Sequence, residues 1–157
     1  MRVWRITKAG FRNTVLSGRG STSRDGGRWN LPGYAAVYLA SSGALALAEV
    51  LVHLRSATHA ARAGLVWFAF DLPEGSIARV DADTLPEGWD SLPPTRASQM
   101  VGTAFLKAGN QLALEVPSVI VPFESNYLLN PDHPAVATLG PVEEIPVEWD
   151  ARFFGEG

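Results

Sequence analysis

The chain has 157 residues, no cysteine, a formal net charge of -3, and contents of 46% hydrophobic and 18% charged residues. This length suits one domain over residues 1–157, with a core that needs no disulfide. The acidic balance argues against direct binding of nucleic acid, and the lack of cysteine excludes thiol chemistry. No apolar run reaches the roughly 20 residues of a membrane span, and no signal peptide follows Met1. We therefore expect a cytoplasmic protein with small-molecule or protein partners.

The first predicted element is a strand over residues 3–7. Its alternation places Val3, Arg5 and Thr7 on one face and Trp4 and Ile6 on the other. Two interpretations of Arg5 stay open at this point. It either faces a cleft or forms the polar side of an edge strand.

Residues 16–33 are rich in serine, glycine, arginine, threonine and asparagine, which predicts an ordered or closing loop rather than a regular element. Arg19, Arg24 and Arg28 lie here among several glycines. Glycine lets the backbone approach a ligand, and the arginine fork suits phosphate oxygens, so the loop is suited to a pyrophosphate. The pattern matches neither the Walker A nor the dinucleotide motif, and a solvated loop is the more frequent explanation of such a composition.

A solitary carboxylate, Glu49, is the only charged residue between Trp29 and Leu54. It lies on a predicted helix that Ser41 or Ser42 caps and that runs to about residue 55. Leu47, Val50, Leu51 and Leu54 form one stripe at helical spacing, and Glu49 projects from the opposite side. That side is also apolar, so we expect the carboxylate to be substantially buried. A buried glutamate is costly unless it is paired or used, so Glu49 is either in a structural ion pair with an arginine or catalytic.

The second half of the chain contains the remaining predicted elements. A buried strand at 64–70 is followed by its expected hairpin partner at 76–80, and a surface loop at 81–94 contains Trp89 as an anchor. A helix follows at 95–108, with Ala97, Met100, Val101, Ala104 and Phe105 as its apolar face. Further strands are expected at 112–115, 119–122, 126–131 and 143–150. The scattered histidines form no metal motif, so we expect no metal centre.

The succession of short motifs along the chain resembles the RES-domain family. These toxins of bacterial RES–Xre toxin–antitoxin modules are named for an arginine, a glutamate and a serine. The motifs follow one another in order over nearly the whole chain, at residues 3–6, 26–30 (GGRWN), 37–40 (VYLA), 48–50 (AEV), 116–122 and 124–134.

The resemblance implies an α+β, ADP-ribosyltransferase-like fold in which two small, mainly antiparallel β-sheets surround an NAD cleft, with flanking helices. It also implies NAD+ as the substrate, without a metal. Members hydrolyse or phosphorolyse the nicotinamide–ribose bond, and some modify a protein with ADP-ribose. An Xre-type antitoxin is the implied partner, giving a hetero-oligomer in which the antitoxin binds the DNA.

The resemblance further assigns site residues. The family's catalytic positions fall on Glu49, Arg28 and Tyr38, and its NAD-binding positions on Arg5, Arg28, Tyr38, Ser118 and Asn126. A fixed carboxylate can stabilise an oxocarbenium-like ribose, arginines can hold the pyrophosphate, and a tyrosine ring can pack against nicotinamide.

Three hypotheses about function remain open. The chain is an NAD+-degrading toxin, a toxin that ADP-ribosylates a specific protein, or a non-catalytic binding module with the same fold. The lone Glu49 with Arg28 nearby disfavours the third.

Overall fold

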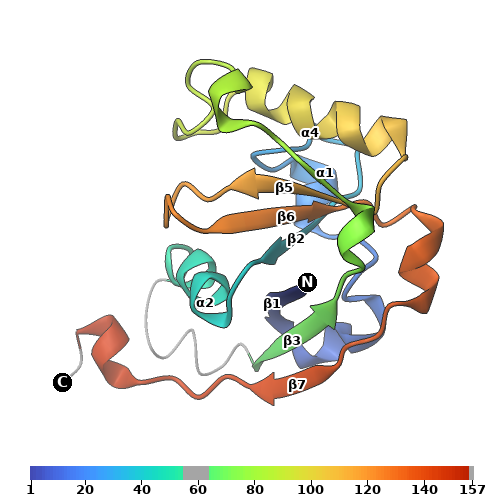
Figure 1. Cartoon of the computed structure of the whole chain (residues 1–157). Helices are drawn as coiled ribbons and strands as arrows, with labels where there is room; N and C mark the ends of the chain where they lie inside the picture. Colours follow the sequence, from blue (N-terminus) through green and yellow to red (C-terminus); the bar gives the residue numbers. More distant parts are fainter. Residues whose placement is uncertain (55–63, 156–157) are drawn as a thin grey trace.

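The computed structural model of the chain describes residues 1–54 and 64–155, as a mixed α/β structure with one sheet (Figure 1). Seven strands follow one another across this sheet in the order β4-β5-β6-β2-β1-β3-β7. Their bounds are β1 Arg2–Lys8, β2 Val37–Ala40, β3 Leu65–Asp71, β4 Ile77–Arg79, β5 Ala113–Pro117, β6 Ser125–Leu129 and β7 Glu143–Pro146. Within the described residues, no helix is long and apolar enough to cross a membrane.

The sheet is continuous only through a narrow seam. β1 pairs with β3 along its whole length, from Arg2 opposite Asp71 to Lys8 opposite Leu65. On its other side β1 pairs with β2 at a single position, Trp4 opposite Ala40. The expectation of two separate sheets is therefore not confirmed. Two groups of strands, β4-β5-β6-β2 and β1-β3-β7, are instead joined at one pair of residues in one sheet.

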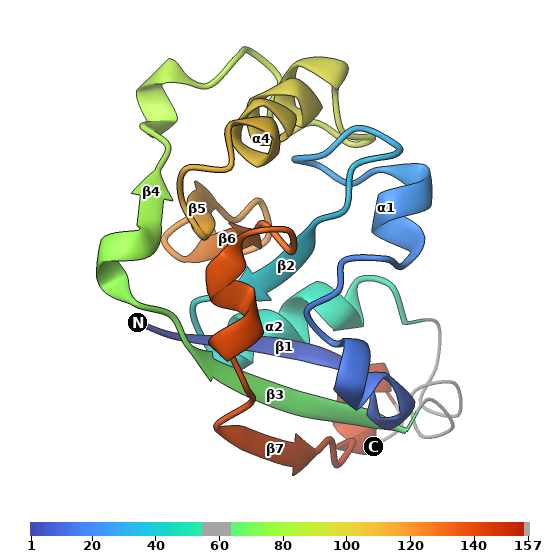
Figure 2. The ribbon, with the colours of Figure 1, turned by 90° about the vertical axis from the view of Figure 1, so that its right-hand side faces the viewer.

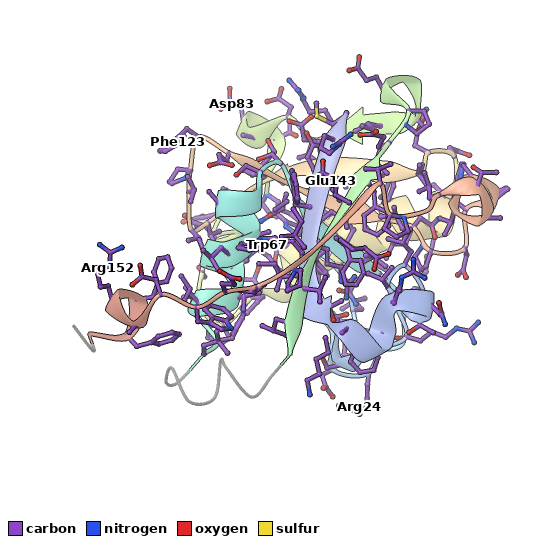
Figure 3. All side chains as sticks on the ribbon, turned by 90° about the horizontal axis from the view of Figure 1, so that it is seen from below. Arg24, Trp67, Asp83, Phe123, Glu143 and Arg152 are labelled. Carbon is purple, nitrogen blue, oxygen red and sulfur yellow. The ribbon has the colours of Figure 1, made fainter. Side chains whose placement is uncertain are left out.

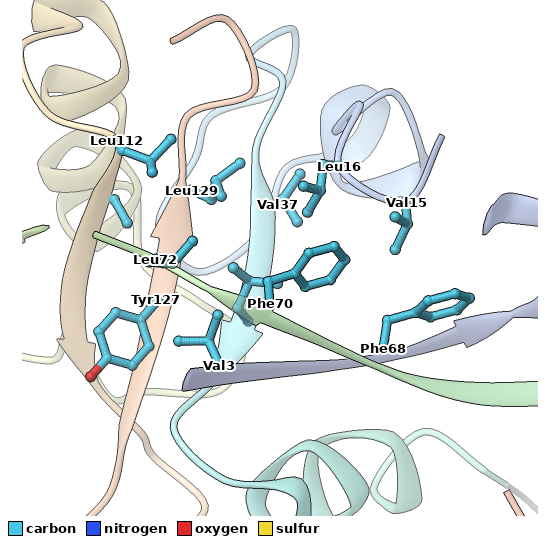
Figure 4. Close-up of a cluster of buried hydrophobic side chains, with 12 residues drawn as sticks. Val3, Val15, Leu16, Val37, Phe68, Phe70, Leu72, Leu112, Tyr127 and Leu129 are labelled. Carbon is cyan, nitrogen blue, oxygen red and sulfur yellow. The ribbon is translucent and has the colours of Figure 1, made fainter. Parts of the chain in front are cut away.

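A hydrophobic core is shared by both strand groups (Figure 4). β1 and β3 contribute side chains such as Val3 and Phe70, which are completely buried, and β2 and β6 contribute Val37 and Leu129. Because Val3 belongs to this core, its strand neighbour Arg5 is directed to the same face, as the alternation predicts. Trp4 and Ile6 point the other way, into a smaller cluster with Leu45 of helix α2.

Helix α2, Gly43–Leu51, lies against β1 and β2 (Figure 1). Its predicted cap is confirmed, because Ser42 Oγ accepts a hydrogen bond from the amide of Leu45 at 3.0 Å. The helix ends at Leu51 instead of near residue 55. Leu47, Val50 and Leu51 of the predicted stripe are only partly buried, whereas Leu45 is fully buried and Ala46 is 5% exposed. Glu49 follows Leu45 by one helical turn, so it lies on the face that packs against the sheet.

Helix α4, Arg96–Ala108, begins and ends as predicted, with Thr95 as the N-cap and Gly109 as a left-handed C-cap. Its expected apolar face is partly wrong, because Ala97, Met100 and Ala104 are exposed. The buried residues are small, namely Ser98, Gly102 and Thr103. They allow a neighbouring segment of backbone to lie directly on the helix. Figure 2 shows α4 beside the β5, β6 and β2 strands, with β7 at the far edge of the sheet.

Other predicted elements differ from those observed. The predicted loop 16–33 contains the short helix α1, Ser21–Asp25. β4 does not form a hairpin with β3 but pairs in parallel with β5. Residues 119–122 form a turn instead of a strand, and this turn joins β5 to its antiparallel neighbour β6. The last predicted strand, 143–150, is confirmed only as far as Pro146.

Candidate active site

The segment Gly26–Leu31, which contains Arg28, is an ordered loop held by hydrogen bonds at both ends. Gln99 of α4 donates its side-chain amide to the carbonyl of Gly27 at 3.0 Å, and Thr103 Oγ1 accepts from the amide of Leu31 at 2.9 Å. A Cβ on Gly102 of α4 would clash with the carbonyl oxygen of Trp29. The small residues of α4 are therefore what lets this loop lie on the helix.

Tyr38 of β2 supports the loop from the other side. Its hydroxyl donates to Asn30 Oδ1 at 2.6 Å and accepts from the amide of Trp29 at 2.9 Å. Gly27 passes so close that a Cβ there would lie 2.5 Å from the Tyr38 oxygen. Burial raises the pKa of Tyr38 well above its ordinary value, although the Trp29 amide and the charge of Arg28 oppose this shift. Tyr38 is therefore neutral at physiological pH, and its hydroxyl links the backbone amide of Trp29 to the side chain of Asn30.

The motif residue Asn30 is fully buried and acts as the hub of the loop. Besides accepting from Tyr38, its amide donates to the carbonyls of Thr22 at 2.7 Å and Tyr34 at 2.9 Å. The sequence pattern had indicated no separate role for Asn30. The only available signal was its position directly after Arg28 and Trp29 in a motif rich in glycine.

Arg28 is fixed in place by the surface loop 81–94. Its Nη1 donates to the carbonyl oxygens of Trp89 at 2.7 Å and Ser91 at 2.9 Å. Trp89 in turn stacks on Trp29, with ring centroids 5.8 Å apart, so its predicted anchoring role is confirmed. Within the described residues, Nε and Nη2 of Arg28 donate no hydrogen bond. One edge of the guanidinium thus remains available for a ligand.

The electrostatic surroundings connect Arg28 with the other site residues. Partial burial lowers the pKa of Arg28, and the negative charges of Asp90 and Glu49 act in the opposite direction. The two carboxylates are thus close enough to affect the guanidinium. Among the described residues, however, Glu49 forms no ion pair. The described residues therefore do not support the interpretation that Glu49 forms a structural ion pair with an arginine.

Glu49 is instead held by two neutral side chains. Asn126 of β6 donates its amide to Glu49 Oε1 at 2.6 Å, and the hydroxyl of Ser118 lies 3.4 Å from the same oxygen. Within the described residues, Oε2 accepts no hydrogen bond. Glu49 is partly exposed, less buried than its apolar surroundings in the sequence predicted. One oxygen is therefore fixed, and the other remains free to contact a bound molecule.

Ser118 lies at the start of the turn between β5 and β6. Its Oγ accepts hydrogen bonds from the amides of Ile120 and Val121, both at 3.1 Å. These bonds occupy the two lone pairs of the hydroxyl oxygen and leave its proton to point toward Glu49. Ser118 thus both shapes the turn and contacts the carboxylate.

Arg5 is not an edge-strand residue, because β1 has neighbours on both sides. Burial lowers the pKa of Arg5 to about 10. Its Nη1 is buried, and no hydrogen-bond partner for it lies within the described residues. Within residues 1–54 and 64–155, no hydrogen bond or ion pair joins Arg5 to Glu49. Arg5 as a whole is partly exposed, but a guanidinium nitrogen buried without a hydrogen-bond partner is costly for the fold, and this cost favours a functional explanation of the residue.

The other two arginines of the loop lie apart from these contacts. Arg24 points into solvent and pairs with the adjacent Asp25 (Figure 3). Arg19 lines a separate hollow of about 510 Å³ with Lys107 and Tyr34 at the C-terminal end of α4. Of the loop arginines, Arg28 is therefore the one associated with the site. It is hydrogen bonded to Trp89 and Ser91, and the charge of Glu49 affects its pKa.

The fold and the site together define a small mixed α/β protein in which two polar side chains hold a carboxylate and an ordered loop carries an arginine within its electrostatic influence. Residues 2–150 match the family described as RES domain. The chain therefore belongs to the RES domain family.

Several relatives share most of their length with this chain. The protein named Toxin Res from Yersinia enterocolitica is 35% identical over 153 residues, which cover 97% of this chain and 99% of that protein. The Prs ADP-ribosylating toxin from a Sphingobium species is 41% identical over 136 residues, or 83% of each chain. A solved structure of the M. tuberculosis MbcT–MbcA toxin–antitoxin complex has a similar fold, with a TM-score of 0.70 at 18% identity. It covers 93% of this chain and 83% of that one.

Proposed function

We propose that this chain is the toxin of a toxin–antitoxin pair and that it cleaves the nicotinamide–ribose bond of NAD+. The observation that supports this proposal best is the arrangement of Glu49. Asn126 and Ser118 hold one carboxylate oxygen, the other accepts no hydrogen bond within the described residues, and the charge of Glu49 acts to raise the pKa of Arg28. The Toxin Res relatives, which are 35–37% identical over most of the chain, add family support for the toxin assignment.

The chemistry of the step follows from these residues. As the bond between ribose C1′ and the nicotinamide nitrogen breaks, its electron pair goes to that nitrogen and neutralises the pyridinium ring. Positive charge develops on the ribose, where a fixed carboxylate stabilises it electrostatically. Glu49 Oε2 supplies this charge or holds a ribose hydroxyl. The free edge of Arg28 binds a pyrophosphate oxygen, and the family resemblance alone assigns Arg5 a second contact to the same group.

Three acceptors for the ADP-ribose cation fit this chemistry. Water or inorganic phosphate would lose a proton as the new bond to C1′ forms, and NAD+ would be depleted. A protein side chain would become ADP-ribosylated. The 41% identical Sphingobium relative, whose name gives Prs as its ADP-ribosylation target, favours the protein acceptor as the second candidate function.

One experiment separates these possibilities. The purified protein is incubated with NAD+, and free nicotinamide is followed with and without phosphate and with and without a cell lysate. We expect nicotinamide release in buffer, with ADP-ribose or its phosphate as the second product. Release that requires lysate and labels one protein band would instead identify a transferase. No release under any condition would overturn the proposal.

An antitoxin partner is part of the same proposal, and the related fold of a toxin solved in complex with its antitoxin supports it. We infer an Xre-type partner that provides the DNA binding, since this chain is acidic overall. If the partner covers Arg28, NAD+ and the antitoxin must weaken each other's binding to the same extent. Titration of the purified complex with a non-hydrolysable NAD+ analogue tests this. Unchanged antitoxin affinity at saturating ligand would show that inhibition acts elsewhere.

A further inference from the structure

A second carboxylate, Glu124, lies at the beginning of the helix that carries Glu49. Its Oε2 accepts hydrogen bonds from Ser42 Oγ at 2.6 Å and from Ser41 Oγ at 3.0 Å. Ser42 is the N-cap of α2, and its oxygen also accepts from the amide of Leu45. The hydroxyl of Ser42 therefore donates a hydrogen bond to Glu124 and accepts one from the first turn of the helix. A negative charge is favourable here, because the helix dipole is positive at this end.

The backbone of Glu124 belongs to the turn that carries Ser118. Its carbonyl accepts from the amide of Ser118 at 3.1 Å, and its amide donates to the carbonyl of Val121 at 2.9 Å. The next residue, Ser125, accepts from the amide of Ser41 at 3.0 Å. Glu124 thus joins the N-terminus of α2 to the turn and to the start of β6.

These are the three elements that meet at Glu49. The helix carries Glu49 itself, the turn carries Ser118, and β6 carries Asn126. Glu49 follows the cap residue Ser42 by seven positions, or about 10 Å along a rigid helix. A displacement of the capped end therefore moves the carboxylate relative to both of its hydrogen-bond donors.

We propose that Glu124 is a positioning residue, which fixes Glu49 against Asn126 and Ser118 without contacting the substrate. This inference rests on the proposed role of Glu49 in cleaving NAD+. The chain offers a matched control in Glu115 of β5, which is also partly buried and hydrogen bonded. Glu115 accepts from Arg79 at 3.0 Å and from Ser125 at 2.9 Å, and none of its recorded hydrogen bonds is to α2.

The test compares nicotinamide release by Glu124→Ala, Glu124→Gln and Glu115→Ala. For Glu124→Ala we expect kcat to fall by about tenfold to a hundredfold, the usual effect of misplacing a catalytic group, with KM for NAD+ changed less than about twofold. Glu124→Gln keeps a carbonyl acceptor for the serine hydroxyls and should recover most of the loss. Glu115→Ala should keep the wild-type kcat. Equal losses for both alanine variants would overturn the proposal.

A double variant distinguishes positioning from a general effect on stability. In the Glu49→Gln background, adding Glu124→Ala should lower kcat no further, because the two residues act as one unit. An additive loss would mean that Glu124 acts by another route.

A second measurement does not depend on turnover. The side-chain amide resonances of Asn126 report its contact with Glu49, and they should shift in Glu124→Ala but not in Glu144→Gln, which alters a carboxylate bound to Arg12 on strand β7. Unshifted resonances would overturn the inference about Glu124. If they shift while the wild type releases no nicotinamide, the proposed function fails and the positioning role stands.

Discussion

The side-chain amide of Asn126 lies 2.6 Å from Oε1 of Glu49, although the two residues are 77 positions apart. The contact joins a helix to a strand next to the seam between β1 and β2, since Asn126 is paired with Ala40 and Ala40 with Trp4. The amide and the hydroxyl hold this carboxylate without placing a positive charge against it, whereas an arginine in contact would offset its negative charge. This arrangement suits a group that must stabilise a developing cation.

The first prediction concerns that charge. Glu49→Gln keeps the shape of the side chain and an acceptor for Asn126, but it removes the charge. We expect nicotinamide release to fall by roughly 10²–10³, the range for loss of one electrostatic stabiliser, with an unchanged unfolding midpoint. The control is Glu144→Gln, which alters a carboxylate bound to Arg12 on the far strand β7. Wild-type turnover by a folded Glu49→Gln protein would contradict the mechanism.

The second prediction concerns the fork of Arg28. Arg28→Lys keeps the positive charge near Glu49, but a single ammonium cannot bind the carbonyls of Trp89 and Ser91 while also presenting a free edge to a phosphate. KM for NAD+ should rise by about tenfold or more, equivalent to one lost hydrogen bond to a charged group. Arg24→Lys, in the same loop but exposed, should leave KM unchanged. Equal KM values for all three proteins would exclude Arg28 from binding.

The third prediction separates the ring of Tyr38 from its hydroxyl. Tyr38→Phe keeps the aromatic face but leaves the Trp29 amide and Asn30 Oδ1 without their partner. The free energy of unfolding should fall by about 1–3 kcal/mol, the cost of unpaired buried groups. Denaturant titration measures this loss. Tyr127→Phe is the control, since among the described residues its hydroxyl makes no hydrogen bond, and it should change stability little.

Tyr38 should also make the stability of the fold depend on pH in the alkaline range. Because the pKa of Tyr38 is raised above its ordinary value of 10.0, the folded state keeps the phenol proton more tightly than the unfolded state. The stabilisation is complete below pH 10 and is lost as pH rises from there toward the folded pKa. The decline above pH 10 should therefore be shallower in Tyr38→Phe than in the wild type. Parallel curves would show that Tyr38 does not titrate as described.

Much of the fold could be predicted because its signals are local. The alternation in β1 and the caps of α2 and α4 each depend on a few neighbouring residues. The pairing of β4 with β5 could not be predicted in this way, since the partners are 36 positions apart and a tight turn after β3 resembles a hairpin. Residues 119–122 were wrongly predicted as a strand for a related reason. Its β-branched residues favour a strand, but the Ser118 hydroxyl binds two of its amides and makes a turn.

The candidate site could be predicted from the sequence only where a residue differed in chemical character from its neighbours. Glu49 stood out because it is a charge in an apolar helix, and Arg28 because it lies among glycines. The groups that hold Arg28 are backbone carbonyls of Trp89 and Ser91, and every residue has a carbonyl, so no sequence signal marks them. The buried face of α4 was missed for a similar reason. Gly102 is there to admit the backbone of Trp29, and periodicity counts only apolar side chains.

The last prediction is that replacing Arg5 raises the stability of the fold and weakens NAD+ binding. Its Nη1 is buried without a partner among the described residues, so the guanidinium is desolvated without full compensation. Arg5→Met replaces it with an apolar side chain of similar length. The free energy of unfolding should rise on the order of 1 kcal/mol, since well-packed apolar groups often replace buried charges with a gain in stability.

The same substitution should weaken NAD+ binding if Arg5 contacts the pyrophosphate. Calorimetric titration in the Glu49→Gln background measures affinity without turnover, and we expect a loss of about tenfold, equivalent to one charge-assisted hydrogen bond. Arg12→Met is the control, because Arg12 is exposed on the surface and should change neither quantity by more than about 0.5 kcal/mol. A stabilised Arg5→Met protein with unchanged affinity would assign Arg5 no part in binding. A destabilised one would mean that the guanidinium is compensated within the fold.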